Sequence, residues 1–341
     1  MSANKILNIG VIGLGHIGPN HVRVFSQCEN AKVQMCADPD AHRREHIEKM
    51  YPSIKVVERA EDIIGDKNIG AVVIATPTHT HYALAKLVLE AGKHLFLEKP
   101  MCLEYTQAKE IVELAKKNNC ALVHGHILLY SQPIQFIRQG ILRGDYGNIQ
   151  YLDTTRTNLG PIRDDINVIY DLATHEFATF DFIFGGLPEW ISVAGSRLLG
   201  TPREDVAFIS MEFPGHILVH THVSWLHPQK TRQFTLVADK KMVVWDDMDA
   251  SEPVKIYDKG IAEEPYYDSF KSFQMCLRDS DVHVPKIKLS EPLLVQAQSF
   301  VRRVLNNEPT FAEAESGLNV MRCLDACTES LKNNGKRVYL K

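Results

Sequence analysis

Short apolar runs alternate with longer amphipathic stretches along the first 123 residues. The apolar runs have the length of buried strands, and the stretches between them carry apolar residues at helical spacing. Strands that alternate with helices in this way form a parallel sheet with helices on both faces. The strands are expected at 6–12, in the run that ends at Asp38, and at 54–57, 71–75, 94–97 and 121–123, and the helices directly after Gly18 and at 40–51, 81–91 and 104–118.

The pattern changes near residue 124. From there on, strands follow one another with short turns, and consecutive strands joined by tight turns pair antiparallel. This pattern predicts an α+β arrangement on a large mixed or antiparallel open sheet. Its strands are expected at 149–157, 190–196, 205–213, 216–225, 231–238 and 241–245, and its helices at 132–143, 171–184, 267–278, 291–306 and 313–332.

A glycine-rich turn follows the first predicted strand. Gly13, Gly15 and Gly18 form a GxGxxG pattern, with His16 and Ile17 before its last glycine. In such a loop the first glycine permits a tight turn, the second lets a pyrophosphate approach, and the third lets the next helix press on the sheet. The start of that helix offers free N–H groups to phosphates. These residues predict a dinucleotide-binding site.

The acid at the end of the second strand indicates which dinucleotide is bound. Asp38 lies twenty residues after Gly18, where a carboxylate accepts hydrogen bonds from ribose hydroxyls and repels a 2′-phosphate. The sequence therefore favours NAD over NADP. Arg43 and Arg44 could serve a phosphate, but we expect them on the solvent face of the helix that follows Pro39.

At 341 residues, the chain is long enough for two domains. We predict an α/β protein with an N-terminal Rossmann doubly wound sheet at 1–123, which binds NAD. An α+β domain at 124–341 is expected to serve substrate binding and oligomerisation, with its C-terminal helix packed back on the first domain.

Composition and charge indicate which kinds of partner and which compartment to expect. A net charge of −4 without a basic stripe gives no reason to expect nucleic acid. The seven cysteines are scattered through apolar segments and are interpreted as buried side chains in a reducing compartment. The first strand leaves no room for a signal peptide, and no apolar run spans a membrane. We expect a cytoplasmic protein with no membrane partner.

In open α/β sheets, ligands usually bind at the carboxyl ends of the strands. Two loops follow such strand ends and are therefore expected to border a ligand. One is Thr76-Pro77-Thr78-His79-Thr80-His81, and the other is Glu98-Lys99-Pro100. Beside a nicotinamide, Lys99 could hydrogen-bond a substrate hydroxyl. It could equally form a surface salt bridge with Glu98, and position alone leaves both readings open.

A second polar cluster lies within the apolar context of residues 167–175. Asp171 and His175 are four residues apart and so share one face of a helix. Such a pair can orient an imidazole and tune its basicity. The alternative is a helix-capping aspartate beside a buried histidine that has no catalytic role.

Two groups of histidines raise the question of a metal site. His79 and His81 alternate with threonines, and His216, His220 and His222 share one face of a predicted strand. We expect no metal, because no acid or cysteine completes a ligand spacing in either place. The histidines of the strand are expected to line a sheet face that meets substrate or another subunit.

The chain resembles the glucose–fructose oxidoreductase, inositol dehydrogenase and rhizopine-catabolism family of NAD(P)-dependent dehydrogenases. The resemblance is carried by residues 13–18, 75–77 and 98–100 and by Asp171 and His175. It implies that Lys99, His175 and Asp171 are catalytic. It also implies that the cofactor site consists of the glycine loop, Asp38, Lys99 and four further residues. These are Thr76, Pro77, His81 and Glu98.

Within the family, several stretches are similar to bacterial dehydrogenases that act at C3 of UDP-N-acetylglucosamine or its uronic acid. They are Gly125-His126, residues 128–130, Arg156, residues 159–163, residues 167–175, and residues 224–228 with Lys230 and Arg232. The resemblance implies a UDP-sugar substrate whose 3-keto product is passed to an aminotransferase for 3-amino sugars, as in lipopolysaccharide synthesis. The implied substrate-binding residues are Lys99, Tyr130, Arg156, Arg163, Asn167, Asp171 and His175.

Two alternatives remain at this stage. One is a dehydrogenase of a free polyol or sugar such as inositol, and the other is a regulator that binds NAD without catalysis. The open sheet must cover its apolar face, and the resemblance implies a homodimer or homotetramer formed through it.

Overall fold

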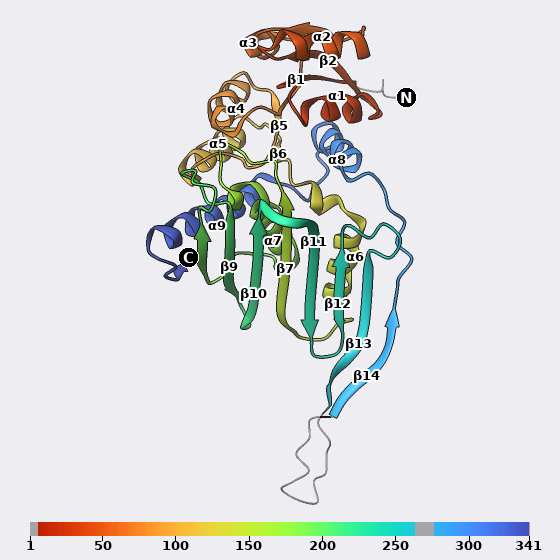
Figure 1. Ribbon diagram of the computed structural model, residues 1–341. Coiled ribbons are helices and arrows are strands. Elements are labelled where there is room, and N and C mark those ends of the chain that lie inside the picture. Colours follow the sequence, from red (N-terminus) through yellow and green to blue (C-terminus); the bar gives the residue numbers. More distant parts are fainter. Residues whose placement is uncertain (1–5, 263–275, 341) are drawn as a thin grey trace, which may run out of the picture. The chain divides into compact units, whose positions relative to one another are not determined.

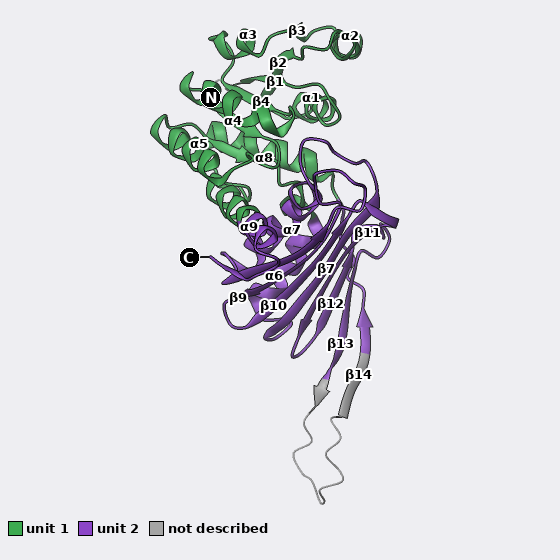
Figure 2. Ribbon diagram, turned by 60° about the vertical axis from the view of Figure 1, so that its left-hand side comes forward, with its two compact units in different colours: residues 1–131, 290–325 green, residues 132–289, 326–341 purple. Residues whose placement is uncertain are grey.

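The computed structural model describes residues 6–262 and 276–340. The chain forms two compact units (Figure 2). The first comprises residues 1–131 and 290–325, and the second comprises residues 132–289 and 326–341. The first unit thus extends past residue 123 and takes in a segment from the C-terminal part of the chain.

The first unit contains a six-stranded parallel sheet of order β3-β2-β1-β4-β5-β6, which confirms the predicted doubly wound sheet (Figure 1). Its strands are β1 Leu7–Ile12, β2 Ala31–Ala37, β3 Lys55–Val57, β4 Ala71–Ile74, β5 His94–Leu97 and β6 Leu122–His124. Its helices are α1 Gly18–Ser26, α2 Ala41–Met50, α3 Ala60–Gly65, α4 His81–Glu90, α5 Tyr105–Lys117 and α8 Pro292–Asn306, with short turns η1 Thr78–Thr80 and η2 Ile127–Tyr130. Helix α9, Ala314–Lys332, contributes to both units.

Three phenylalanines from distant parts of the sequence pack around one face of β5. Phe25 on α1, Phe96 on β5 and Phe300 on α8 meet edge to face, with ring centroids 5.7–6.0 Å apart. All three side chains are fully buried. Edge-to-face contact adds to the gain from burying aromatic area. The cluster therefore fixes α1 and α8 on β5, the strand that leads into Glu98 and Lys99.

The second unit contains a nine-stranded sheet of order β14-β13-β12-β11-β7-β10-β9-β8-β15. The pair β7–β10 is parallel and the other pairs described are antiparallel, so the expected mixed sheet is confirmed. Its strands are β7 Ile149–Leu159, β8 Trp190–Ser196, β9 Val206–Phe213, β10 Ile217–Ser224, β11 Leu226–Ala238, β12 Met242–Asp246, β13 Val254–Ala262, β14 Cys276–His283 and β15 Val338–Tyr339. Helices α6 Gln132–Arg143 and α7 Thr174–Phe184, the latter preceded by the π-helical turn η3 Ile169–Ala173, cover one face (Figure 1).

The expected and observed elements differ most near the edge of this sheet. The helix expected at 267–278 lies outside the described residues up to 275, and residues 276–278 begin strand β14 instead. Strand β13 was not predicted, because Asp258 and Lys259 interrupt its apolar alternation. The register with β14 shifts between Tyr257 and Lys259, which accommodates that interruption.

The aromatic cluster gives a prediction about stability. We expect Phe300→Ala to lower the free energy of unfolding of the first unit by about 3–5 kcal/mol, because it leaves a cavity between Phe25 and Phe96. Scanning calorimetry should show a lower melting temperature. Leu87→Ala, at an exposed position of α4, serves as the control and should leave the melting temperature nearly unchanged. Equal effects of the two substitutions would contradict this account of the cluster.

Candidate active site

The glycine loop joins β1 to α1 with little space between backbone segments. Gly13 has φ +93°, and a Cβ there would lie 2.6 Å from the carbonyl oxygen of Ala75. A Cβ on Gly18 would lie 2.0 Å from the carbonyl oxygen of Gly13. At Gly15 the nearest neighbouring atom is the Arg43 Nη1, 3.7 Å from the Cβ position. The loop is thus closed on two sides and open at Gly15, as expected for a backbone that a pyrophosphate approaches.

The carboxylate of Asp38 is buried and binds the glycine loop. Its Oδ2 accepts a hydrogen bond from the Leu14 N–H at 2.7 Å, and its Oδ1 accepts one from the Asp40 N–H at 2.9 Å. The half-exposed Arg43 places Nη1 3.6 Å from Oδ2. Arg44 turns back and donates to the carbonyl oxygens of Asp38 and Pro39, at 2.8 and 2.9 Å. Of the two arginines expected at the solvent face, Arg44 therefore stabilises the end of β2 instead.

His81 connects the two loops at the carboxyl ends of β4 and β5. Its Nε2 lies 2.9 Å from the Thr76 carbonyl oxygen, and its Nδ1 lies 2.9 Å from the Pro100 carbonyl oxygen. The side chain is buried. Burial lowers the pKa of His81, because it disfavours the charged ring more than the two carbonyls favour it. His81 therefore holds the two loops together. Two other residues expected at the cofactor, His16 and Pro77, are exposed at the surface of the first unit.

The side chain of Glu98 points into the first unit. Its Oε1 lies 2.7 Å from Nε2 of His21 on α1, and its Oε2 accepts the Lys99 backbone N–H at 3.0 Å. Both oxygens of the carboxylate are therefore held within the first unit. Tyr130 was expected to bind substrate. Its side chain is buried in the first unit, and its hydroxyl contacts the Thr310 hydroxyl.

The second unit holds Asp171 in the π-helical turn, directly before the first turn of α7 that carries His175. Oδ2 of Asp171 accepts a hydrogen bond from the Trp225 indole N–H at 3.1 Å. Its Oδ1 lies 3.6 Å from Nη1 of Arg163. The second guanidinium edge of Arg163 binds Asp165, at 2.8 and 2.6 Å. The Asp171 carboxylate is thus fixed in position, and His175 is partly exposed.

Asn167 begins this segment. Its Oδ1 accepts the Tyr170 N–H at 3.1 Å, and its Nδ2 donates to Oε2 of Glu204 at 2.9 Å. A side-chain oxygen in this position satisfies a backbone donor at the start of a helix. The structure thus gives Asn167 a local role in orienting the turn that carries Asp171.

Arg156 and Arg232 are opposite each other on β7 and β11. Arg156 forms a buried ion pair with Glu176 on α7. Arg232 donates to the Thr157 and Thr231 carbonyl oxygens and to Oδ1 of Asn158. Burial, followed by the charge of Arg156, lowers the pKa of Arg232 to about 10. Both guanidinium groups therefore already have partners within the second unit.

No role was predicted for His21 or Glu176, and Trp225 was named only as part of the stretch 224–228. His21 and Phe25 lie four residues apart on α1 and both are buried, so a histidine on the apolar face of the helix was an available signal. Trp225 and Glu176 meet Asp171 and Arg156 only through tertiary contacts, for which the sequence gives no spacing.

Within residues 6–262 and 276–340, no three histidine, cysteine or acidic side chains are grouped so that they could hold a metal ion. Among the helices in those residues, none has the length and apolar character needed to cross a bilayer.

The glycine loop, the buried acid after β2 and the parallel sheet define the first unit as the NAD-binding domain of an oxidoreductase. Comparison with protein families agrees. Residues 7–126 match the oxidoreductase family with an NAD-binding Rossmann fold, and residues 134–244 match the GFO/IDH/MocA C-terminal domain. The chain belongs to the Gfo/Idh/MocA oxidoreductase family, whose N-terminal domain is an NAD-binding Rossmann fold, and its cofactor is NAD.

Individual relatives differ in what they act on. The UDP-N-acetylglucosamine 3-dehydrogenase of Acidithiobacillus ferrooxidans is 25% identical over 92% of this chain and 94% of its own. Its structure has a TM-score of 0.81 at 22% identity and covers 95% of this chain and 97% of that one. The myo-inositol 2-dehydrogenase of Thermotoga maritima is 26% identical over 57% of this chain and 59% of its own length. WlbA dehydrogenase from Bordetella pertussis, solved with NADH and UDP-GlcNAcA, has a TM-score of 0.81 at 17% identity, covering 98% of this chain and 99% of that one.

The contacts of Asp38 give a prediction about cofactor binding. We expect Asp38→Ala to weaken NAD binding by about tenfold or more, which is about 1.4 kcal/mol. The substitution removes a ribose acceptor and also releases the Leu14 N–H that holds the glycine loop. Titration calorimetry should show the loss, together with weaker discrimination against NADP. Glu48→Gln, at an exposed position of α2, should bind NAD normally. Unchanged NAD affinity in Asp38→Ala would contradict the assignment.

Proposed function

We propose that this protein oxidises the C3 hydroxyl of a UDP-N-acetylglucosamine-type sugar nucleotide to a ketone, with NAD as the oxidant. The observation that carries the proposal is the match to a UDP-N-acetylglucosamine 3-dehydrogenase over nearly the full length of both chains. The 3-keto product would be the substrate of an aminotransferase that makes a 3-amino sugar.

The resemblance to the family, together with the chemistry of the side chains, suggests the role of each catalytic residue. NAD⁺, when bound, accepts the hydride from the substrate carbon. His175 accepts the proton of the reacting hydroxyl, and Lys99 donates a hydrogen bond to the same oxygen and stabilises the negative charge that develops there. Asp171, held by Trp225 and Arg163, orients the imidazole of His175 or a sugar hydroxyl.

The positively charged side chains of the second unit affect which substrate it can bind. Arg156 and Arg163 are ion-paired and Arg232 is held by oxygens of its neighbours, so binding a diphosphate with them would require a rearrangement of these contacts. Lys230 lies two residues before Arg232 on β11 and is exposed. We propose Lys230 as a diphosphate contact that requires no such rearrangement. The pairing of the arginines is also the observation that favours the second candidate, a dehydrogenase of an uncharged polyol or sugar such as inositol.

One experiment separates the two candidates. The purified protein is incubated with NAD⁺ and UDP-N-acetylglucosamine, its uronic acid, or myo-inositol, and the product ketone is trapped while NADH absorbance is followed. A trapped 3-keto sugar nucleotide is expected. Turnover of inositol alone would replace the proposal with the second candidate, and binding of NAD without turnover of any of them would contradict both.

The proposed base gives a mutational prediction. We expect His175→Asn to lower kcat by about 10²–10⁴-fold while NAD affinity is unchanged, since general-base catalysis contributes a factor of that size. Stopped-flow absorbance and calorimetric titration measure the two quantities. His216→Asn is the matched control, because His216 is 94% exposed on a turn of the second unit. Full activity of His175→Asn would remove His175 from the role.

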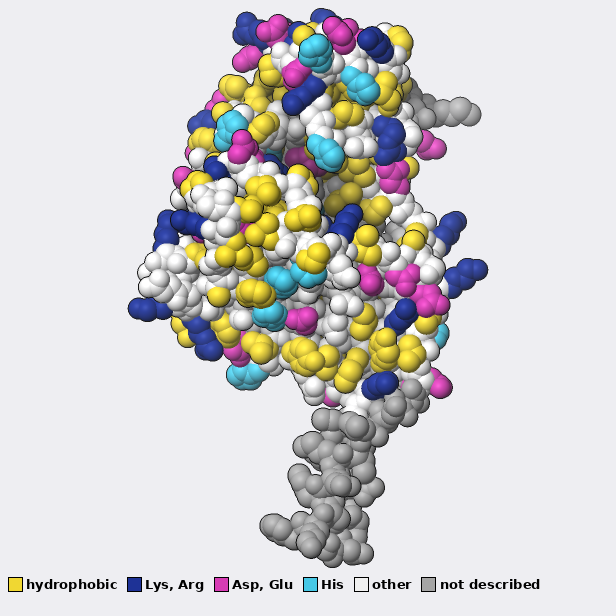
Figure 3. Space-filling view, in the orientation of Figure 1, with side chains coloured by type: hydrophobic (Ala, Val, Ile, Leu, Met, Phe, Trp, Pro, Cys, Tyr) yellow, Lys and Arg dark blue, Asp and Glu magenta, His cyan; other side chains and the backbone are white. Residues whose placement is uncertain are grey.

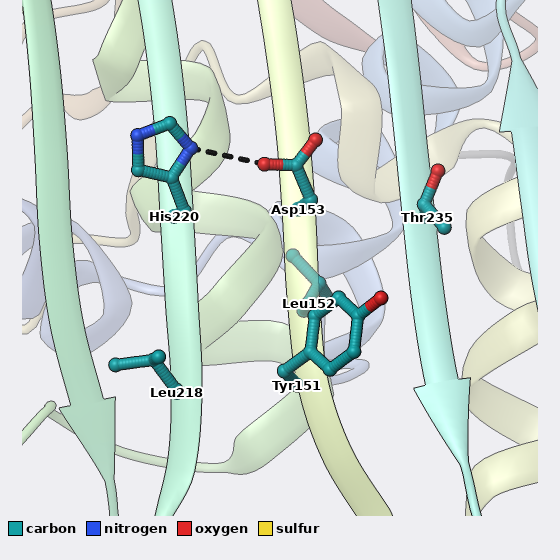
Figure 4. Close-up of a pocket in the computed structure, with 6 residues that line it drawn as sticks. All are labelled: Tyr151, Leu152, Asp153, Leu218, His220 and Thr235. Carbon is teal, nitrogen blue, oxygen red and sulfur yellow. Dashed lines mark hydrogen bonds and ion pairs between the residues drawn. The ribbon is translucent and has the colours of Figure 1, made fainter.

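We also propose that the protein self-associates through the uncovered face of the large sheet. Tyr151, Phe208 and Leu218 expose 46%, 46% and 49% of their surface there, and apolar and histidine side chains gather on this face (Figure 3). A shallow pocket of about 320 Å³ lies among Tyr151, Leu152, Asp153, Leu218, His220 and Thr235 (Figure 4). At its edge, Nδ1 of His220 lies 2.9 Å from Oδ1 of Asp153. An apolar patch of this kind is typical of a subunit interface, so a homodimer or homotetramer is expected.

The proposed interface predicts the effect of a surface charge. We expect Leu218→Lys to reduce the oligomer to smaller species in size-exclusion chromatography with light scattering, because association would bury the lysine charge. Leu142→Lys introduces the same charge on α6, where Leu142 is 66% exposed. The control should leave the mass unchanged. Dissociation by Leu142→Lys but not by Leu218→Lys would place the interface elsewhere.

A further inference from the structure

We propose that His21 and Glu98 form a buried positioning pair for Lys99, so that Glu98 acts on the reaction through Lys99 and is not a ligand of the cofactor. This inference rests on the proposed function, because it takes Lys99 as the residue that contacts the reacting oxygen. It changes the role that the sequence suggested for Glu98 and assigns one to His21.

Both carboxylate oxygens of Glu98 have partners within the protein. Oε1 lies 2.7 Å from Nε2 of His21, whose side chain is 1% exposed, and the side chain of Glu98 is 12% exposed. Oε2 accepts the Lys99 N–H at 3.0 Å. A carboxylate in this arrangement fixes the backbone at Lys99 from the inside of the domain.

Gly125 leaves the space that this carboxylate occupies. A Cβ on Gly125 would lie 2.6 Å from Oε2 and 2.9 Å from Oε1 of Glu98. Gly125 is not among the glycines with positive φ, so its backbone does not require glycine. Its N–H donates to the Leu97 carbonyl oxygen at 2.8 Å and ties β6 to the strand that carries Glu98. The missing side chain at Gly125 therefore serves the position of Glu98.

Glu98 is ionised at neutral pH although its side chain is largely buried. Burial by itself raises the pKa of Glu98, but the hydrogen bond and charge of His21 and the N–H and charge of Lys99 outweigh it and hold the pKa below its usual value. Four charged or titratable side chains interact electrostatically with Glu98. They are His21 on α1, His81 on α4, Lys99 after β5 and His124 at the end of β6. A buried charge is expensive to desolvate, so its presence beside Lys99 indicates that the charge itself has a use.

The experiment compares Glu98→Gln, His21→Asn and the double variant in the full-length protein. Glutamine keeps an oxygen that can accept the Lys99 N–H but removes the charge. We expect each single variant to leave the Kd for NAD within about twofold of the original and to lower kcat by about tenfold or more. The pH profile of kcat should shift in both. The double variant should be no worse than the single ones, because the two residues act as one unit.

A second readout needs neither cofactor nor substrate. Labelling of Lys99 by an amine-specific reagent, followed by peptide mass spectrometry, should be several-fold faster in Glu98→Gln and in His21→Asn. Gly125→Ala, which displaces the carboxylate but keeps both charged residues, should have the same effect. Glu110→Gln is the control, because Glu110 pairs with Lys86 at 2.7 Å on the surface. It should change the labelling of Lys86 and leave that of Lys99 and the enzymatic activity unaltered.

The outcomes separate this inference from the proposed function. A tenfold weaker Kd for NAD in Glu98→Gln, with normal NAD binding in His21→Asn, would make Glu98 a cofactor ligand and overturn the pair. Unchanged kcat, pH profile and Lys99 labelling in Glu98→Gln would overturn it as well. If the unaltered protein oxidises no sugar while both variants change Lys99 labelling, the pair is supported and the proposed function is wrong.

Discussion

The cofactor site depends on one steric constraint, the close approach of the backbone at Gly13, Gly18 and Ala75. A single Cβ at Gly13 or Gly18 would overlap a carbonyl oxygen, and no side-chain adjustment relieves a clash with backbone. Because these glycines let α1 start directly above the sheet, the N-terminus of α1 is available to phosphates. The same helix carries His21 to Glu98 and Phe25 to the aromatic cluster. The packing of α1 therefore determines the phosphate site and the position of the Lys99 loop together.

Buried hydrogen bonds then connect the loops at the carboxyl ends of the strands. Asp38 joins the glycine loop to the end of β2, and His81 joins the loop at Thr76 to Pro100. Each uses a side chain to satisfy backbone groups that lie beyond the sheet ladders, and unsatisfied buried groups are costly. The loops are consequently held by the protein itself, which lowers the ordering cost of binding a cofactor.

The parts of the site that could be predicted from the sequence are those with a local signal. The spacing of Gly13, Gly18 and Asp38 follows from one βαβ unit, and periodicity located the strands that precede Thr76 and Glu98. The contacts of Trp225 with Asp171 could not be predicted, because they join positions 54 residues apart. The same holds for the pairing of His21 with Glu98, 77 residues apart. Helix prediction at 276–278 failed for a related reason, since pairing with β13 determines that strand.

Each unit has a buried carboxylate next to a residue that we propose to act in the reaction, and the two carboxylates have different partners. An ion pair inside a protein contributes little net stability, because desolvation offsets the attraction, but removing one partner is costly. One oxygen of Glu98 accepts the backbone N–H of Lys99, and the other lies 2.7 Å from Nε2 of His21. Arg156 with Glu176, by contrast, ties β7 to α7, the helix whose first turn carries His175. An arginine paired in this way holds the helix that carries His175, and binding an anion with its guanidinium would first require the ion pair with Glu176 to open. For this reason we propose the exposed Lys230 as the contact of a charged substrate.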